Sequence, residues 1–379
     1  MTRPAIPFID LATQQKRIRA KVDAAVARVL DHGQYILGPE VAQLEAEMAA
    51  FSGVKHAIAC SNGTDALTLC LMARGVGPGD VVLCPSFTFA STAEVVAQLG
   101  ATPFFVDIEE GSFNLSPASL RAALDHAREI GMKVVGLISV DLFGQPADYD
   151  SLEPIVEEAG IWLLCDAAQG YGGVYKNRKV GTIGDFTTTS FFPAKPLGCY
   201  GDGGAIYTND DDTAALLRSL LFHGKGSDRY DNVRIGMNGR LDTIQAAILI
   251  EKLALFPEEI VSRNAVADRY ENGLSNVLTT PRIAEGSTSV WAQYCVRAPG
   301  KNRGAILAKL AEAGVPTAVY YPKPLHQQTA YRDFPTAPNG LPMSEEVAQD
   351  IFALPMHPYL DASTQDYIID QVAEAVRAA

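Results

Sequence analysis

From His56 onward, short continuous apolar runs alternate with longer segments that have helical periodicity. Continuous apolar strands separated by helices are typical of a mostly parallel sheet covered on both faces. The seven runs expected to form strands are 56–60, 81–85, 102–107, 133–140, 161–167, 186–192 and 203–209. The pattern predicts an α/β fold in which ligands bind at the carboxyl ends of the strands.

Helical patterns flank this region on both sides. Two helices are expected before residue 53, the first ending at Gly33, and two more near 211–222 and 242–255. Asp242 with Gln245 three residues later predicts an acidic capping box. Pro257 marks a plausible hinge, so we expect a large domain over 1–256 and a small one over 257–379. The small domain should hold helices at 258–277, 302–314 and 363–378, with strands near 291–297 and 315–320.

Composition excludes several classes of protein. A net charge of −13 argues against a general nucleic-acid binder, which needs a basic stripe. The six cysteines are scattered singly, without a CxxC pair or Cys/His cluster, so we expect reduced buried thiols and no metal site. No signal-peptide pattern and no apolar window of about 20 residues is found, which predicts a cytoplasmic protein without a membrane span.

Lys195 is the first candidate for chemistry. It lies between Pro193 and Pro196, after an apolar run and before a glycine-rich turn. Burial or nearby positive charge lowers a lysine pKa because both penalise the ammonium form. An amine so activated can hold an aldehyde cofactor as a Schiff base. Taken alone, the stretch also fits an ordinary surface lysine.

The loop 61–67 follows the first expected strand and opens a helix. Free backbone N–H groups and the positive end of the helix dipole make such a place suitable for a phosphate. Gly63 would permit close approach, and Thr64 and Ser190 could add hydroxyl donors. Strand–glycine–helix turns without a phosphate are common, so the loop remains open to both interpretations.

Asp166 ends one of the most apolar strands of the chain. A carboxylate there is costly unless it meets a positive partner, and a protonated pyridine nitrogen is such a partner. Gln169 could reach the phenolic oxygen of the same ring, and Phe87 or Phe89 could stack on it. The alternatives are a cap or ion pair for Asp166, a turn cap for Gln169 and core packing for the aromatic rings.

Taken together and in order, these motifs resemble the DegT/StrS family of pyridoxal-phosphate nucleotide-sugar aminotransferases. The matching segments are NGTDAL (62–67), PSFTFAST (85–92), DAAQ (166–169), SFFPAKPLG (190–198), GDGGAIYTND (201–210) and NGRLDTIQAA (238–247).

The resemblance implies a type I aminotransferase fold, pyridoxal 5′-phosphate as cofactor, and a homodimer whose active sites take residues from both chains. It implies these roles: Lys195 as the Schiff-base lysine, Asp166 as partner of the ring nitrogen, Gln169 beside the ring hydroxyl, Gly63, Thr64 and Ser190 as phosphate ligands, Phe89 as the stacking ring, and Asn238 reaching the phosphate from the other subunit.

Within the family, the chain most resembles enzymes that aminate C3 of UDP-2-acetamido-2-deoxy-3-oxoglucuronate for surface polysaccharides such as the lipopolysaccharide O-antigen, with L-glutamate as donor. Arg240 could then clamp the sugar carboxylate, although an ion pair at the dimer interface is its other interpretation. Tyr320 and Tyr321 are expected on the sugar side, and close relatives can carry histidine in place of Tyr320. Two alternatives remain open, namely an aminotransferase for a 4-keto-6-deoxy nucleotide sugar and a non-catalytic binding or regulatory protein.

Overall fold

The computed structural model describes residues 5–228 and 230–379. Its helices are α1 (Leu11–His32), α2 (Pro39–Ser52), α3 (Gly63–Ala73), α4 (Ser91–Gln98), α5 (Pro117–Glu129), α6 (Tyr149–Ala159), α7 (Asp211–Leu220), α8 (Thr243–Leu253), α9 (Phe256–Leu274), α10 (Arg303–Glu312), α11 (Pro342–Asp350) and α12 (Ala362–Arg377), with short 3-10 turns η1 (Leu142–Gly144) and η2 (Leu325–Gln327).

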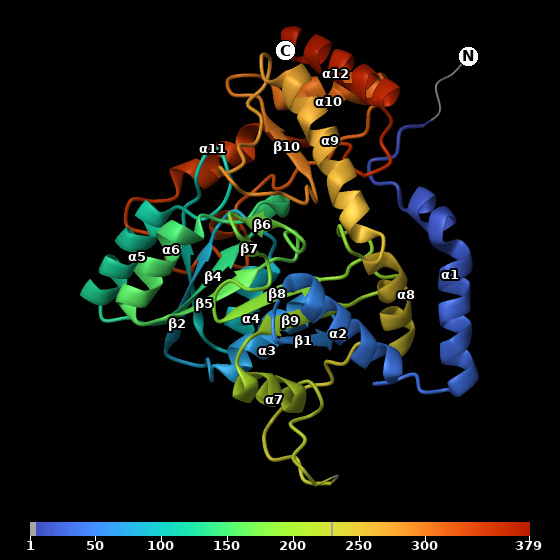
Figure 1. Ribbon diagram of the computed structural model, residues 1–379. Helices are drawn as coiled ribbons and strands as arrows, with labels where there is room; N and C mark the ends of the chain where they lie inside the picture. The colour runs from blue at the N-terminus through green and yellow to red at the C-terminus, as the bar shows by residue number, and fades with distance from the viewer. Residues whose placement is uncertain (1–4, 229) are drawn as a thin grey trace.

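The strands are β1 (His56–Cys60), β2 (Asp80–Pro85), β3 (Thr102–Val106), β4 (Lys133–Val140), β5 (Trp162–Asp166), β6 (Val174–Tyr175), β7 (Arg178–Lys179), β8 (Phe186–Ser190), β9 (Gly204–Thr208), β10 (Tyr294–Arg297) and β11 (Ile351–Leu354). A seven-stranded sheet in the order β1-β9-β8-β5-β4-β2-β3 forms the centre of the molecule (Figure 1). Only β9 runs against its neighbours, which confirms the predicted mostly parallel α/β sheet.

Both faces of the sheet are covered by helices. On β1, Ile58 belongs to the apolar cluster that includes α3 and α5, whereas Ala57 belongs to the cluster built with α2 and α8. The alternation follows from the period of two residues in a strand. All six cysteines are free and buried, as predicted.

Local signals place the ends of the first helices. The Asp10 carboxylate accepts a hydrogen bond from the Thr13 N–H (2.9 Å) and so caps α1, and Gly33 ends the helix with a φ of 71°. This first helix packs against α8 through Ile18, Val22 and Ile248.

Two local predictions were wrong. Asp242 precedes α8 but makes no capping hydrogen bond, because the Gln245 amide oxygen instead accepts from the Tyr200 N–H (2.9 Å). The segment 315–320 forms only an isolated bridge at Ala318, since Pro316 has no N–H for a ladder. The strand that pairs with β10 is β11, which the sequence pattern did not indicate.

A second apolar cluster joins α9, β10, α10, β11 and α12. The segment between α10 and α11 returns to the large sheet. There the Phe105 N–H donates to the Pro335 carbonyl (2.9 Å), and the Ala337 N–H donates to the Phe105 carbonyl (2.9 Å). The division of the chain near Pro257 stays a prediction.

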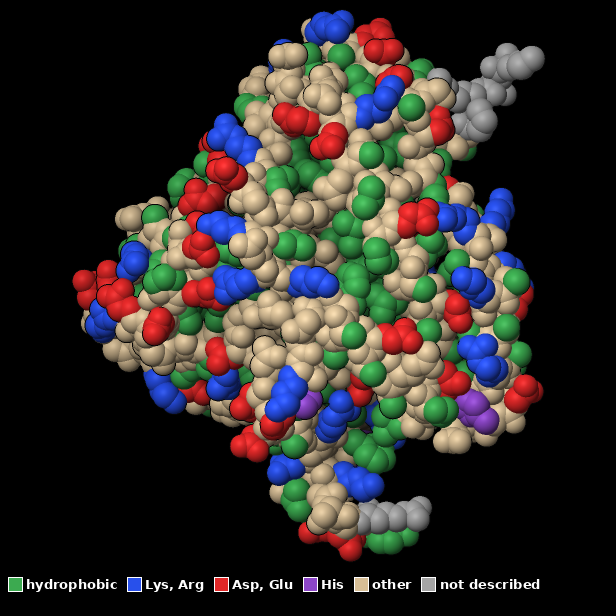
Figure 2. Space-filling model, in the orientation of Figure 1, with side chains coloured by type: hydrophobic (Ala, Val, Ile, Leu, Met, Phe, Trp, Pro, Cys, Tyr) green, Lys and Arg blue, Asp and Glu red, His purple; other side chains and the backbone are tan. Residues whose placement is uncertain are grey.

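Lys, Arg, Asp and Glu side chains are interspersed over the face in Figure 2. No helix of the described residues is long and apolar enough to span a membrane.

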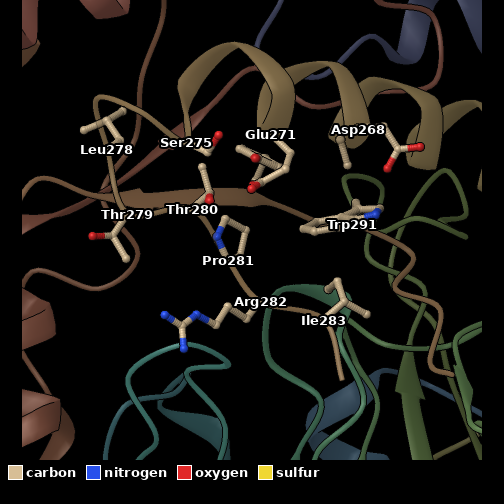
Figure 3. A pocket seen from close by; sticks show the side chains of 12 residues that line it. Asp268, Glu271, Ser275, Leu278, Thr279, Thr280, Pro281, Arg282, Ile283 and Trp291 are labelled. Atoms are coloured by element: carbon tan, nitrogen blue, oxygen red, sulfur yellow. The ribbon is translucent and has the colours of Figure 1, made fainter. Parts of the chain in front are cut away.

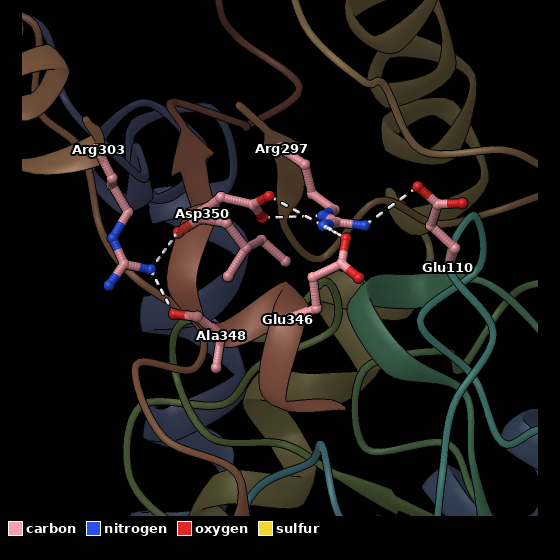
Figure 4. Close-up of polar contacts among 7 residues, drawn as sticks. Glu110, Arg297, Arg303, Glu346, Ala348 and Asp350 are labelled. Atoms are coloured by element: carbon pink, nitrogen blue, oxygen red, sulfur yellow. Dashed lines mark hydrogen bonds and ion pairs between the residues drawn. The ribbon is translucent and has the colours of Figure 1, made fainter. Parts of the chain in front are cut away.

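Arg297 on β10 connects the two parts of the molecule (Figure 4). Its side chain has no exposed surface, and its guanidinium binds both oxygens of Asp350 (2.8 and 2.9 Å). It also contacts Glu346 (2.7 Å) on α11 and Glu110 (3.2 Å) in the loop after β3. Burial lowers the Arg297 pKa, but Asp350 and Glu346 together raise it by more, so the buried cation stays charged.

Arg297→Met should lower the free energy of unfolding by about 3 kcal/mol, because it leaves the buried Asp350 without its counter-ion. Urea denaturation followed by circular dichroism measures the change. Arg269→Met is the matched control, since Arg269 forms a similar bidentate pair with Asp366 (2.8 and 2.6 Å) on the exposed surface and should change stability little. Equal losses for both variants would contradict the argument.

Candidate active site

The predicted site residues converge on one edge of the sheet. Asp166 is the last residue of β5, Ser190 is the last of β8, and Gly204 begins the antiparallel β9 beside it. Gly63 follows β1, whose last residue pairs with Gly204. The carboxyl ends of the parallel strands therefore bring residues distant in sequence to one place, as expected for this fold class.

The loop before α3 has the geometry of an anion cradle. The Asn62 side chain accepts from the Asp65 N–H (2.8 Å), while the N–H groups of Gly63 and Thr64 have no acceptor among the described residues. A Cβ at Gly63 would lie 2.7 Å from the Ser190 Cβ, so only glycine fits. Ser190 is therefore held against the two free amides, and its hydroxyl hydrogen remains available to donate.

Asp166 is a buried carboxylate, 5% exposed. One oxygen accepts from the Ala168 N–H (3.0 Å) and the other from the Thr92 hydroxyl (3.5 Å). Burial raises its pKa, and the hydrogen bond from Ala168 and the charge of Lys195 oppose this rise. The carboxylate has no ion pair among the residues described, so a cationic ligand group would stabilise it strongly.

Lys195 lies in a tight turn, because its N–H donates to the Phe192 carbonyl (2.8 Å). Burial lowers its pKa to about 8, while the negative charge of Asp166 acts in the opposite direction. A minor but useful fraction of its amine is therefore unprotonated near neutral pH, as a nucleophile or proton acceptor requires.

Gln169 and the tyrosine pair form one wall. The Gln169 side-chain oxygen accepts from the Phe143 N–H (2.6 Å), and its amide donates to the Tyr321 hydroxyl (3.3 Å). Tyr321 lies edge-on to the buried Phe87, with ring centroids 5.8 Å apart. Phe89 in the same loop is 57% exposed, so its ring is free to cover a flat ligand. Tyr320 is half-buried beside Tyr321, with ring centroids 6.0 Å apart.

Arg240 and Asn238 lie in a neighbouring cavity of about 480 Å³, which also includes Ser61 and Ile36. The Arg240 guanidinium donates to the Asn238 side-chain oxygen (2.6 Å) and lies 4.9 Å from the centroid of the Phe222 ring. Its Nε is buried and has no partner among the described residues. The cavity adjoins the anion cradle, because the Ser61 N–H donates to the Gly239 carbonyl (2.9 Å).

Sequence reasoning missed Asp141, a fully buried acid directly after β4. It accepts hydrogen bonds from the Tyr149 hydroxyl (2.6 Å) and the Ala147 N–H (2.9 Å), and burial raises its pKa to about 7. Its own N–H donates to the Asp166 carbonyl (3.0 Å). A polar residue at the end of the strand 133–140 was the signal that could have identified it. No group of three or more His, Cys, Asp or Glu side chains in the described part of the chain is placed to hold a metal ion.

Comparison with known proteins places this fold and site in a family. The model of the DegT/DnrJ/EryC1/StrS aminotransferase family matches residues 16–373, so the chain belongs to that family. It is 49% identical over 360 residues to the UDP-2-acetamido-2-deoxy-3-oxo-D-glucuronate aminotransferase of Pseudomonas aeruginosa, covering 95% of this chain and 97% of that protein.

Solved structures agree. A family member from Brucella abortus has a TM-score of 0.96 and 49% identity, covering 97% of this chain and 99% of that chain. A putative sugar aminotransferase from Streptococcus pneumoniae, solved in a PLP form, has a TM-score of 0.89 and 26% identity, covering 99% of each chain. Its PMP form has the same TM-score and identity and covers 99% of this chain and 98% of that chain. The type I aminotransferase fold predicted from the sequence is therefore confirmed.

The position of Lys195 makes its reactivity dependent on pH. In protein freed of bound small molecules, we expect acylation of Lys195 by acetic anhydride to increase with pH around 8, whereas an unperturbed lysine titrates near ~10.4. The Asp166 carboxylate favours the ammonium form, so Asp166→Asn should shift the reactivity of Lys195 to lower pH. Mass spectrometry of the peptide that contains Lys195 measures both profiles. A shift to higher pH in the variant would contradict the assigned interaction.

Proposed function

We propose that this chain, a pyridoxal-phosphate-dependent sugar aminotransferase, aminates a UDP-linked keto-sugar, namely UDP-2-acetamido-2-deoxy-3-oxoglucuronate. The observation that carries the proposal is the low-pKa amine of Lys195 near the buried Asp166, on the strand edge that also carries an anion cradle. The relative from Pseudomonas aeruginosa, 49% identical to this chain, is named for that substrate.

The residues present fit the cofactor. The free amides of Gly63 and Thr64 and the Ser190 hydroxyl would hold its phosphate. Asp166 would face its ring nitrogen, which gives the buried carboxylate a cationic partner. Gln169 would lie beside the ring hydroxyl, and the exposed Phe89 would cover the ring. When bound, pyridoxal phosphate supplies an electron-accepting ring that carries the amino group from donor to acceptor.

The chain's own groups then move protons. Lys195 Nζ, partly unprotonated near pH 7, would accept the proton from the α-carbon of the amino donor and pass it to the bound cofactor, and would move a proton from the cofactor to the sugar carbon during amination. Asp166 would keep the ring nitrogen of the bound cofactor protonated through a charge-assisted hydrogen bond. The Asp141 N–H donates to the Asp166 carbonyl, and the Phe143 N–H of the η1 turn donates to the Gln169 side chain, so Asp166 and Gln169 keep their positions.

The environment of Arg240 favours a uronate over a neutral sugar as the substrate. A guanidinium binds a carboxylate bidentately, and the Nε of Arg240 is buried without a partner in the described residues. A ligand carboxylate would satisfy that donor, whereas a neutral hexose would leave it unpaired. Tyr320 and Tyr321 would contact the sugar from the opposite wall.

Assembly and pathway are part of the proposal. We infer a homodimer in which Asn238 reaches the phosphate of the partner's cofactor. Support comes from exposed apolar side chains, among them Tyr35, Ile36 and Leu37 before α2 and Val233 and Ile235 in the loop after α7. This loop projects from the body of the molecule below α7 (Figure 1).

The proposal also covers the donor, the pathway and the location. L-Glutamate would be the amino donor. The product would serve the synthesis of a surface polysaccharide such as the O-antigen, and the enzyme would act in the cytoplasm.

An absorption experiment tests the proposed function. With pyridoxal phosphate, the protein should show a band near ~410–430 nm that L-glutamate replaces with one near ~330 nm. The Lys195→Ala variant should show neither the change in absorption nor turnover, because no amine remains to move the proton. The Lys301→Ala variant, which alters an exposed lysine, should behave as wild type. A protein without a band would be a binding or regulatory protein instead.

Arg240→Ala tests the substrate. Loss of a charge-assisted contact worth roughly 1.5–3 kcal/mol should lower kcat/KM for the 3-oxo-uronate by about tenfold or more, with a much smaller effect on the matched neutral keto-sugar. Arg121→Ala on the surface of α5 is the control. Equal losses for both sugars would reduce Arg240 to a structural role, and preference for a 4-keto-6-deoxy sugar would favour the alternative substrate.

A further inference from the structure

A second cavity, of about 680 Å³, lies in the C-terminal part of the molecule, away from the strand edge that carries Lys195 (Figure 3). One side is α9, which contributes Asp268 and Glu271, with Ser275 directly after the helix. The other side is the extended segment 278–283 together with the aromatic residues Trp291 and Tyr294. This volume is in the range of small-molecule sites, and nothing in the proposed transamination uses it.

The cavity carries negative charge that the chain does not neutralise. Asp268 and Glu271 have no hydrogen-bonding or ion-pair partner for their carboxylates in the described parts of the chain. They are three residues apart and therefore lie on the same side of the helix. Arg282 also lines the cavity, but its side chain points away from both acids in Figure 3. The acidic pair thus dominates this end of the cavity.

Tyr294 gives an independent indication of a ligand. The residue is 1% exposed and lines the cavity, and its hydroxyl is buried without a hydrogen-bond partner among the described residues. The phenol and the two acids line the same cavity, and burial, followed by the charges of Glu271 and Asp268, raises the Tyr294 pKa. Buried hydroxyls without partners are rare in folded proteins, and a bound group that pairs with this one would remove the desolvation penalty.

Trp291 supplies a rigid aromatic surface at the same place. Its centroid lies 5.4 Å from that of Tyr294, and its indole N–H donates to the Asn264 side chain (3.1 Å). Its carbonyl accepts from the Arg263 guanidinium (3.0 Å). Its backbone has a φ of 49°, a conformation rare for bulky residues that persists only where surrounding contacts impose it.

We propose that this cavity binds a small molecule through an ammonium group. An ammonium has three N–H donors and no acceptor, which suits two carboxylates and a phenol oxygen. Its charge is also attracted to the face of an indole ring. A metal ion is less suited, because the described residues include no group of three or more His, Cys, Asp or Glu side chains placed to hold one. The site is distinct from that of the amino donor, whose amino group must reach Lys195.

The test uses n-butylammonium as probe and the emission of Trp291 as readout. The chain has two tryptophans, so the Trp162→Phe background, with the full chain loaded with pyridoxal phosphate, leaves Trp291 as the only reporter. We expect a saturable change in emission with n-butylammonium and none with n-butanol or butyrate. Glu271→Gln should weaken binding about tenfold, and Tyr294→Phe should weaken it while keeping the ring in place.

The matched control is Glu312→Gln, which removes one negative charge from the exposed surface of α10 and should leave binding unchanged. A response of equal size with n-butanol would show that the cavity is only an apolar surface and would overturn the proposal. Equal binding by the Glu271→Gln variant, or no saturable change with the amine, would also overturn it.

Discussion

The active site depends on a carboxylate that is buried where burial is costly. Asp166 ends an apolar strand, and its pKa is raised because water cannot reach it. Burial also penalises the charged form of Lys195, but for an amine this lowers the pKa, so the ammonium group loses its proton more easily. The two shifts have one cause, the loss of contact with water. A cationic group beside Asp166 would offset its negative charge and so leave more of the Lys195 amine unprotonated.

A second layer of contacts keeps these groups in place. The η1 turn after β4 holds Gln169 through the Phe143 N–H, and the Asp141 N–H joins that turn to β5 at Asp166. Gly170 packs so closely on Asp141 that a Cβ there would lie 2.5 Å from the aspartate Cβ. Glycine is therefore required both here and at the anion cradle, because side chains that carry chemistry occupy the adjoining space.

The C-terminal part of the chain contributes to the site as well as covering it. Tyr321 reaches Gln169, and the segment near Ala337 runs beside β3. Arg297 connects β10 and α11 to the loop after β3 through three carboxylates. A buried guanidinium with several partners gives little net stability compared with an apolar core but strongly favours one arrangement of its partners.

The sequence by itself determined the sheet, its parallel character and most of the residues on its carboxyl edge. Apolar periodicity and the motifs around Gly63, Asp166 and Lys195 are local properties that can be read along the chain. Only the tertiary structure decided that Asp141 supports Asp166, that Gln245 bonds Tyr200 instead of capping α8, and that β11 pairs with β10. It alone brought Asp268, Glu271, Trp291 and Tyr294 around one cavity. These features depend on which distant groups meet, and the burial that shifts a pKa or leaves a hydroxyl without a partner exists only after the chain has packed.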